Sequence, residues 1–456
     1  MGRPSPRSSS LGGQAETTHP STPRRSSGWL TRWSLEVNSL SMTLSVGIAG
    51  LLGVAYWALA ARLISSEQVG RAAAIISTMT MLGTIANLSL GPMLERFLPV
   101  SGQRAGGYLV RAQLITASFA ILLGTGFCLV GPVGAMFTEP WQPPLFVGFV
   151  IVQAAFALQD NILTSLGVAR WAAIKNTGHA ALKIATMLLV VVVATGFTMA
   201  LSWVVVSALA VLVVIVVVNW QLPRLTAEFR DDLPPRRELW SYFGSHYGIV
   251  VVASVPGLVI PLIVLSRLGP VATAHFNLAW VLVAAMLTVL GAVVGPFVAE
   301  AAARPENVLP LLRRFVRMVV PIAVGGGAFL AFGAPWLLRL VGKDYGVESL
   351  PLLRVMGATV ALSAITSCYA VLAKVERRLA LLVGVQIGTA IVVIGLTELW
   401  IVPLELAGVG LAYLIVQVAS CLIVIGPLIA SIRRLRQAAA DRAAADVATE
   451  LPTPAG

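Results

Sequence analysis

Long apolar runs constrain this chain more than any other feature of its sequence. A helix needs about 20 apolar residues to cross roughly 30 Å of hydrocarbon, and twelve such runs follow one another, separated by short polar segments. They lie near residues 40–61, 73–93, 109–130, 144–165, 177–196, 199–219, 246–266, 274–297, 318–338, 353–373, 379–397 and 407–430. Only 11% of the residues are charged, far below the roughly 25% typical of soluble domains. The sequence therefore predicts an all-α, polytopic membrane protein with twelve transmembrane helices.

The distribution of lysine and arginine predicts the orientation of these helices. With a cytoplasmic N-terminus, 25 of the 32 basic residues fall in cytoplasmic segments and 6 fall outside. This is the asymmetry of the positive-inside rule, and one missed or added helix would scramble it. We expect both termini in the cytoplasm. The net charge of +12 then orients the helices and meets anionic membrane lipids, so it does not indicate a nucleic-acid partner.

The longest inner loop divides the runs into two groups of six. Features recur about 205 residues apart, as in Arg62 with Arg267 and Glu95 with Glu300. Six is even, so the two pseudo-symmetric lobes would share one orientation, related by an axis along the membrane normal. The predicted organisation is a disordered cytoplasmic tail (1–37), an N-terminal lobe (38–220), a cytoplasmic linker (221–242), a C-terminal lobe (243–432) and a second disordered cytoplasmic tail (433–456).

Ionisable residues within the runs are few, and such groups usually face the bundle interior or a water-filled cavity. Asp160 lies about five residues before the inner end of its run, and Lys183 about six residues into the next. At 1.5 Å per residue both are about 8 to 10 Å deep, so they can face each other. Asn176, His179 and Lys183, spaced i, i+3, i+7, form one helical stripe.

Two interpretations of these polar residues remain open. In the first, Asp160 and Lys183 form a buried ion pair that only holds two helices together. In the second, Lys183 and His179 attract an anionic group, while Asp160 binds a coupling cation or balances the charge, and protonation breaks the pair.

Other positions are weaker candidates for a transport path. Pro256, Gly257 and Pro261 weaken the seventh helix at mid-membrane and predict a bend or hinge. His275 near the outer end of the eighth helix, and Asn87 on one face of the second, are polar groups that either line a path or serve packing.

Several kinds of chemistry lack the residues they need. The chain has no Gly-x-x-x-x-Gly-Lys-Ser/Thr loop and no His, Cys and carboxylate cluster with metal-ligand spacing. We therefore expect no enzyme activity, no metal site and no cofactor. If transport is energised, its energy would come from a proton or sodium gradient or from the substrate's own chemistry.

Several segments combine aromatic, Gly-Pro and polar residues in a recognisable order. They are Tyr56-Trp57-Ala58-Leu59-Ala60-Ala61-Arg62-Leu63 with Glu67-Gln68-Val69-Gly70, Leu88 to Pro92, Arg96-Phe97-Leu98-Pro99, and Leu158-Gln159-Asp160-Asn161-Ile162-Leu163-Thr164 followed by Trp171, Asn176 and Lys183. These segments resemble bacterial polysaccharide flippases of the multidrug/oligosaccharidyl-lipid/polysaccharide exporter superfamily. The last group is similar to the branch that exports lipopolysaccharide or O-units. The resemblance covers roughly residues 38–432, and its motifs are loose.

The resemblance implies two six-helix lobes around a central cavity that opens alternately to each side of the bacterial cytoplasmic membrane. The implied cargo is a lipid-linked oligosaccharide for surface polysaccharide synthesis, whose polyprenyl tail stays in lipid. Lys183 and His179 would bind its phosphate or pyrophosphate, with Arg62 and Arg267 as weaker candidates. Other polysaccharide-synthesis membrane proteins are possible partners.

Three alternatives remain. A multidrug exporter of the same superfamily would couple to protons or sodium through Asp160, but usually carries carboxylates in its cavity. A peptidoglycan-precursor flippase is less favoured, because that branch has helices beyond twelve. A non-transporting scaffold of a polysaccharide synthase complex would not need polar residues that face each other on two helices.

Overall fold

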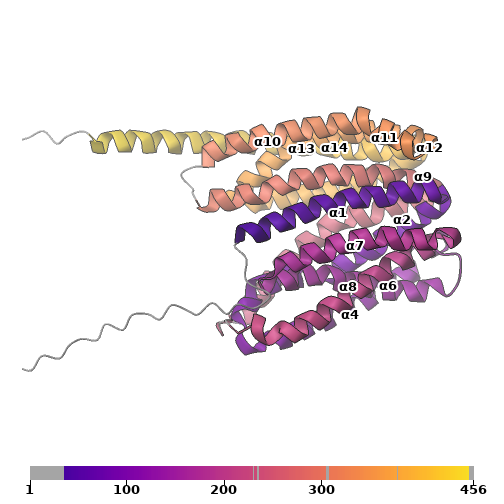
Figure 1. Cartoon of the computed structure of the whole chain (residues 1–456). Coiled ribbons are helices and arrows are strands. Elements are labelled where there is room, and N and C mark those ends of the chain that lie inside the picture. Colours follow the sequence, from indigo (N-terminus) through magenta and orange to yellow (C-terminus); the bar gives the residue numbers. More distant parts are fainter. Residues whose placement is uncertain are drawn as a thin grey trace, which may run out of the picture.

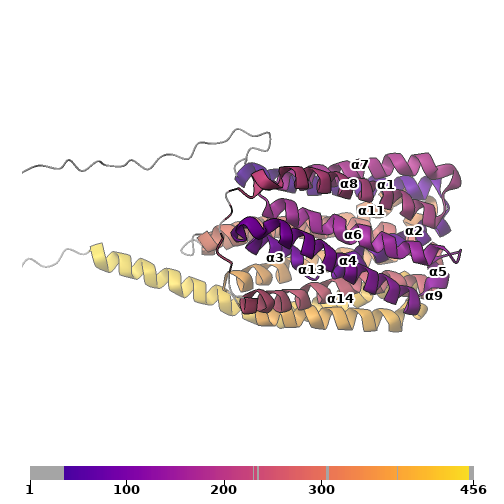
Figure 2. The same cartoon turned by 90° about the horizontal axis from the view of Figure 1, so that it is seen from below.

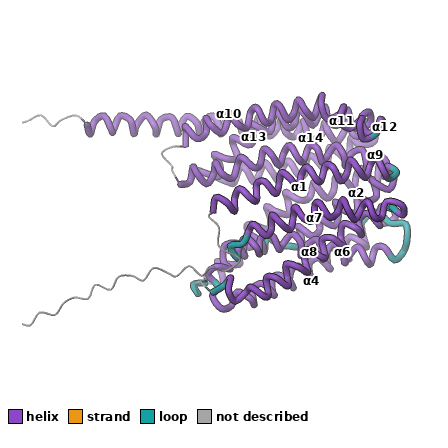
Figure 3. Tube along the Cα trace, viewed as in Figure 1, coloured by secondary structure: helices purple, strands orange, loops and turns teal. Residues whose placement is uncertain are grey.

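The structure is a computed structural model that describes residues 35–227, 229, 231–233, 236–303, 308–376 and 378–450. Within these residues the chain is a bundle of roughly parallel helices (Figures 1 and 3). The first part of the chain contributes α1 (Leu35–Leu63), α2 (Ser66–Ala86), α3 (Leu90–Phe97), α4 (Ala105–Val130), α5 (Val133–Met136), α6 (Gln142–Ser165), α7 (Ala169–Val190) and α8 (Gly196–Leu225). The second part contributes α9 (Arg236–Ala303), α10 (Val308–Ala328), the π-helical turn η5 (Phe329–Gly333), α11 (Ala334–Val341), α12 (Lys343–Glu348), α13 (Leu350–Val375) and α14 (Leu379–Glu450).

Nine helical segments in the described part of the chain are long and apolar enough to cross a membrane. Two of them, Ser254–Val294 and Leu379–Ala438, contain 41 and 60 residues and a backbone break, at Gly269 (φ 82°) and Glu405 (φ 51°) respectively. In α14 the halves on either side of Glu405 contact each other, since the hydroxyls of Thr389 and Ser420 are 3.3 Å apart. Each of these segments therefore passes twice, and with the shorter apolar helix Gly47–Leu63 there are twelve passes. The predicted all-α, twelve-helix fold is confirmed.

The helices divide into an N-terminal lobe (α1 to α8) and a C-terminal lobe (α9 to α14). The end of the bundle at which α1 starts is called the terminal end here, and the end at which α1 finishes is called the distal end (Figure 2). Because each pass reverses direction, α6 runs from the distal to the terminal end and α7 runs back. The largest apolar core contains buried residues of both lobes, whereas a separate cluster around Leu94 and Leu158 belongs to the N-terminal lobe.

Backbone geometry explains where several helices begin and end. The second run was predicted to continue to residue 93, but α2 ends at Ala86, because Leu88 and Ser89 adopt left-handed conformations (φ 49° and 57°) before α3 begins. The break before α8 follows the Thr195-Gly196 punctuation. The Thr195 hydroxyl accepts a 3.1 Å hydrogen bond from the Thr198 backbone N–H, which satisfies one of the free donors of the first turn.

Two further helix boundaries differ from the sequence prediction. The fifth run was placed at 177–196, but α7 begins eight residues earlier, at Ala169. At the other end of the chain, α14 is helical to Glu450, whereas a disordered tail was expected from residue 433. Alanine is the strongest helix former, and the Ala-rich sequence after Gln437 favours continuation of the helix. Residues 1–34 of the expected N-terminal tail lie outside the described residues, and 35–37 belong to α1 (Leu35–Leu63).

Candidate transport site

The main polar cluster lies between α6 and α7, near the terminal end. The Lys175 Nζ atom is 2.8 Å from Asp160 Oδ1, and the side chains are 3% and 32% exposed. Asn176 Nδ2 donates a 3.0 Å hydrogen bond to Asp160 Oδ2. Lys175 Nζ also lies 3.6 Å from the centre of the Phe156 ring and donates to the Phe156 backbone carbonyl. The Asp160 carboxylate and the carbonyl and ring of Phe156 all belong to α6, so these contacts of Lys175 join the two helices.

The predicted pairing of Asp160 with Lys183 is wrong, and the start of α7 explains why. Asp160 lies five residues before the end of α6, and Lys175 lies six residues after the start of α7, so these two are level. Lys183 is fourteen residues into α7, which at 1.5 Å per residue is about 21 Å from the terminal end. Lys183 is therefore near mid-membrane, well beyond Asp160.

Lys183 occupies an aromatic environment inside the N-terminal lobe. Its Nζ atom lies 3.9 Å from the centre of the Trp203 ring of α8 and 5.4 Å from that of Tyr56 of α1. These positions are within the range of cation–π attraction. No carboxylate among the described residues is within 4.0 Å of this ammonium, and the residue is 6% exposed. Lys183 is thus a buried cation stabilised by ring faces, without a neighbouring anion.

His179 lies between the two lysines on the same face of α7. Its Nε2 atom is 2.9 Å from the Ser207 hydroxyl of α8, which also accepts a 3.0 Å hydrogen bond from Gln153 Nε2 of α6. The imidazole packs between the rings of Phe156 and Trp203, at centroid distances of 4.7 and 5.7 Å. This network joins α6, α7 and α8 in the middle of the lobe.

Lys175, His179 and Lys183 therefore form one buried stripe at intervals of four residues. Residues at i and i+4 share a helix face, so the sequence contained the signal that places Lys175 in this stripe. The predicted run 177–196 starts after Lys175, so the sequence prediction places this residue in a cytoplasmic loop. The contributions of Tyr56, Trp203 and Ser207 had no comparable signal, since their contacts with α7 depend on helix packing.

The two arginines that match in sequence differ in their contacts. Arg62 on α1 donates from Nε to the Leu340 backbone carbonyl of α11 at 3.0 Å, and Nη2 donates to the same oxygen. Arg267 on α9 forms an ion pair with Glu398 of α14. Arg62 therefore joins the two lobes at the distal end, while the charge of Arg267 is compensated within the C-terminal lobe.

The remaining candidates lie apart from the α7 stripe. The His275 ring on α9 packs edge-on against Tyr345 of α12, 4.8 Å between centroids, and its backbone carbonyl accepts from Ser349. Asn87 caps α2, and its side-chain oxygen is buried without a hydrogen-bond partner among the described residues. Their part in a transport path stays a prediction.

The predicted hinge segment is helical in this conformation. Dihedral angles remain helical through Pro256, Gly257 and Pro261, and the break in α9 lies at Gly269. Gly257 faces the other lobe, because a β-carbon there would lie 3.1 Å from Met81 Cε of α2. A movement at this segment stays a prediction.

No protein-family model matches the sequence, and no curated protein matches it. Solved structures do match. An inward-facing multidrug resistance MATE family transporter of the MOP superfamily aligns with a TM-score of 0.65 over 88% of this chain and 99% of that chain, at 14% identity. The lipid II flippase MurJ, in an inward closed conformation, aligns with a TM-score of 0.62 over 92% and 94%, at 12% identity.

A third match is a MOP superfamily transporter from Pyrococcus furiosus, described by a reverse polarity of its binding pocket that suggests a different function. It aligns with a TM-score of 0.56 over 89% of this chain and 98% of that chain, at 14% identity. The protein is a multi-pass membrane protein with the twelve-helix fold of these transporters.

Proposed function

We propose that the protein is a membrane transporter that moves a polyprenyl-phosphate- or pyrophosphate-linked oligosaccharide across the bacterial cytoplasmic membrane, for surface polysaccharide synthesis. The fold, shared with transporters that include a lipid flippase, supports transport by alternating access. The charge of the N-terminal lobe favours an anionic cargo. In this proposal both termini are cytoplasmic, so the distal end faces outward.

The observation that carries the proposal is the uncompensated cation at Lys183. Lys175 is neutralised by Asp160 at 2.8 Å, whereas Lys183 contacts only aromatic rings among the described residues. Two unit charges 10 Å apart interact by about 1.7 kcal/mol at an effective dielectric constant of 20. A phosphate that came within about 10 Å of Lys183 would therefore bind roughly tenfold more tightly without touching it.

A cation-coupled multidrug exporter is the second candidate, and the match to a multidrug resistance transporter favours it. A drug-cation exporter needs a carboxylate that is free to exchange its cation. Asp160, which is 32% exposed, would have to release the Lys175 ammonium and the Asn176 amide first. A lobe interior in which the unpaired charge is positive fits an anion better.

The test is a complementation experiment in a deletion strain. We expect the strain to lose surface polysaccharide and to accumulate undecaprenyl-linked units on the inner leaflet. Lys183→Met should restore transport poorly and Lys183→Arg better, because arginine keeps the charge and stacks on aromatic faces. Arg267→Met is the matched control, since it removes a cation that Glu398 already neutralises.

The readouts separate the candidate functions. Surface glycan and lipid-linked intermediates would be quantified at equal protein abundance in the membrane, together with susceptibility to cationic drugs. If the deletion strain had normal surface glycan but increased susceptibility to cationic drugs, the flippase proposal would be wrong and the multidrug exporter would be favoured. Full complementation by Lys183→Met would show that the buried charge is not needed, and loss of glycan without accumulation of intermediates would favour the scaffold.

A further inference from the structure

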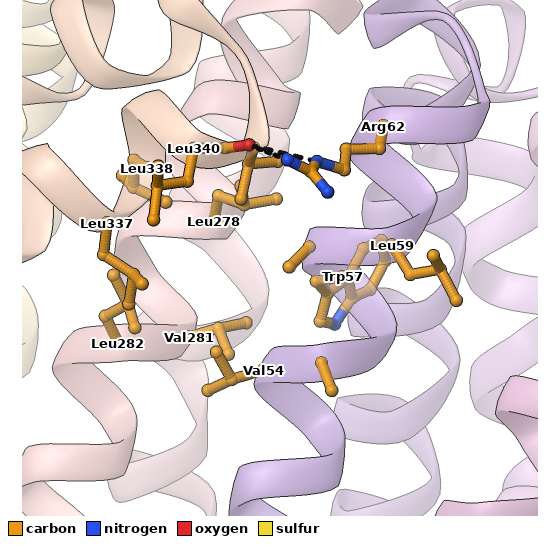
Figure 4. A pocket seen from close by; sticks show the side chains of 13 residues that line it. Val54, Trp57, Leu59, Arg62, Leu278, Val281, Leu282, Leu337, Leu338 and Leu340 are labelled. Carbon is orange, nitrogen blue, oxygen red and sulfur yellow. Dashed lines mark hydrogen bonds between the residues drawn. The ribbon is translucent and has the colours of Figure 1, made fainter.

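A pocket of about 450 Å³ lies between the two lobes in the distal half of the bundle (Figure 4). The N-terminal lobe lines it with one face of α1, including Val54, Trp57 and Arg62. The C-terminal lobe lines it with residues of α9 and α11, including Leu278, Leu282 and Leu340. All three helices belong to apolar segments long enough, or nearly so, to cross a membrane. The pocket is thus at membrane depth.

The lining changes from charged to apolar along the direction of the membrane normal. Arg62, in the last turn of α1, is the one charged residue among those that line the pocket. Val54 is eight residues earlier, about 12 Å deeper at 1.5 Å per residue, and Val281 and Leu282 line the same deeper part of the pocket (Figure 4). A phospholipid has this same profile, with a phosphate at the interface and an acyl chain below it.

We propose that this pocket binds one acyl chain of an anionic phospholipid from the distal leaflet, with the phosphate at the Arg62 guanidinium. A zwitterionic lipid carries a positive headgroup next to its phosphate and is attracted less. The acyl chain gains no hydrophobic free energy from entering the slot, because it leaves lipid tails that are as apolar as the lining. The preference therefore comes from the headgroup, since one arginine near the membrane surface adds about 1 kcal/mol of attraction to an anionic lipid.

The lipid would also change the contact between the lobes. The Leu340 carbonyl is one of the last four of α11 (Ala334–Val341), which lack intrahelical partners, and Arg62 supplies its donors. Hydrogen bonds from a guanidinium to a phosphate are stronger than those to a neutral carbonyl. A bound anionic lipid therefore competes with Leu340 for Arg62 and weakens this contact between the lobes at the distal end.

The site does not depend on the nature of the transported cargo, so a binding experiment tests it separately from transport. The full-length protein would be reconstituted in nanodiscs that contain mixtures of phosphatidylglycerol and phosphatidylcholine, one of them brominated on its acyl chains. Bromine quenches tryptophan fluorescence at contact distance. The difference between wild type and Trp57→Phe isolates the signal of Trp57, which lines the pocket.

We expect brominated phosphatidylglycerol to reach half-maximal quenching of Trp57 at a mole fraction roughly fivefold lower than brominated phosphatidylcholine. Arg62→Gln should abolish this preference, Arg62→Lys should keep most of it, and Arg267→Gln, an arginine near the distal end outside the pocket, should leave it unchanged. Ala58→Phe, which fills the pocket, should reduce quenching by both lipids. Equal quenching by the two lipids in wild type, or an unchanged preference in well-folded Arg62→Gln, would overturn the proposal.

Discussion

At the scale of single residues, the buried ammonium charge of Lys175 depends on its neighbours for stabilisation. Its side chain is 3% exposed and its ammonium has three partners, the Asp160 carboxylate and the carbonyl and ring of Phe156. Taking a charge out of water costs several kcal/mol, which an ion pair offsets only when its partner is in place. Loss of the Asp160 carboxylate should therefore strongly destabilise the folded protein, whichever function the lobe performs.

Removing the carboxylate and removing the cation should have unequal effects. Asp160→Asn leaves a buried ammonium unpaired, and we expect it to lower stability by about 3 kcal/mol. Lys175→Met leaves a carboxylate that is 32% exposed and should cost less. The double variant should be more stable than Asp160→Asn alone. Thermal unfolding of the detergent-purified variants measures this order, and equal loss in both single variants would contradict it.

Among the helices, the contact of α2 with α9 brings the backbones of the two lobes closest at the distal end. A β-carbon at Gly70 would lie 1.7 Å from the Pro270 carbonyl oxygen. Any side chain at this position would therefore clash with the α9 backbone. Small residues allow such approach between membrane helices. Gly70 together with the Arg62 contact therefore holds the distal end closed in this conformation.

Any larger residue at position 70 should separate α2 from α9. We expect Gly70→Ala to move the population toward conformations that are open at the distal end, because the added methyl group cannot be accommodated by side-chain rotation. Spin labels attached at positions 67 of α2 and 344 of α12, where Glu67 and Asp344 are exposed, should then lie farther apart than in the wild type. Pulsed electron paramagnetic resonance spectroscopy measures this distance. Gly107→Ala, where nothing lies within 4 Å of the added atom, is the control, and identical distance distributions would show that this contact does not hold the end closed.

For the whole molecule, the orientation in the membrane follows from the charge of its segments. The helices place the start of α1 and the ends of α8, α13 and α14 on one side, and α5 and α12 on the other (Figures 1 and 2). With Lys175 set aside because it lies within α7, 24 basic residues fall in the segments expected on the first side and 6 in those expected on the other, so the positive-inside rule predicts that the first side is cytoplasmic.

Fusions to a reporter test this orientation. Green fluorescent protein joined after Glu450 should fluoresce, since it folds in the cytoplasm. Alkaline phosphatase inserted after Gly342, in the segment between α11 and α12, should be active, since it folds outside. The opposite pattern would invert the topology and, with it, the direction of transport proposed for the cargo.

The sequence by itself determined the class of fold. Twelve apolar runs and the side preference of basic residues are local properties that a bilayer imposes on every helix, so they are visible without knowing how the helices pack. Helix ends are harder to predict from the sequence. The start of α7 at Ala169 and the left-handed conformations of Leu88 and Ser89 depend on backbone geometry that hydropathy does not describe.

Only the tertiary structure decided which polar groups are partners. Because α7 starts eight residues earlier than predicted, Lys175 rather than Lys183 lies beside Asp160. Each residue moves a side chain 1.5 Å along the helix axis. The aromatic contacts of Lys183 and the Arg62 contact with Leu340 join residues up to 278 positions apart. Such pairs depend on which helix faces pack together, and hydropathy, which counts apolar residues along the chain, contains no information about that choice.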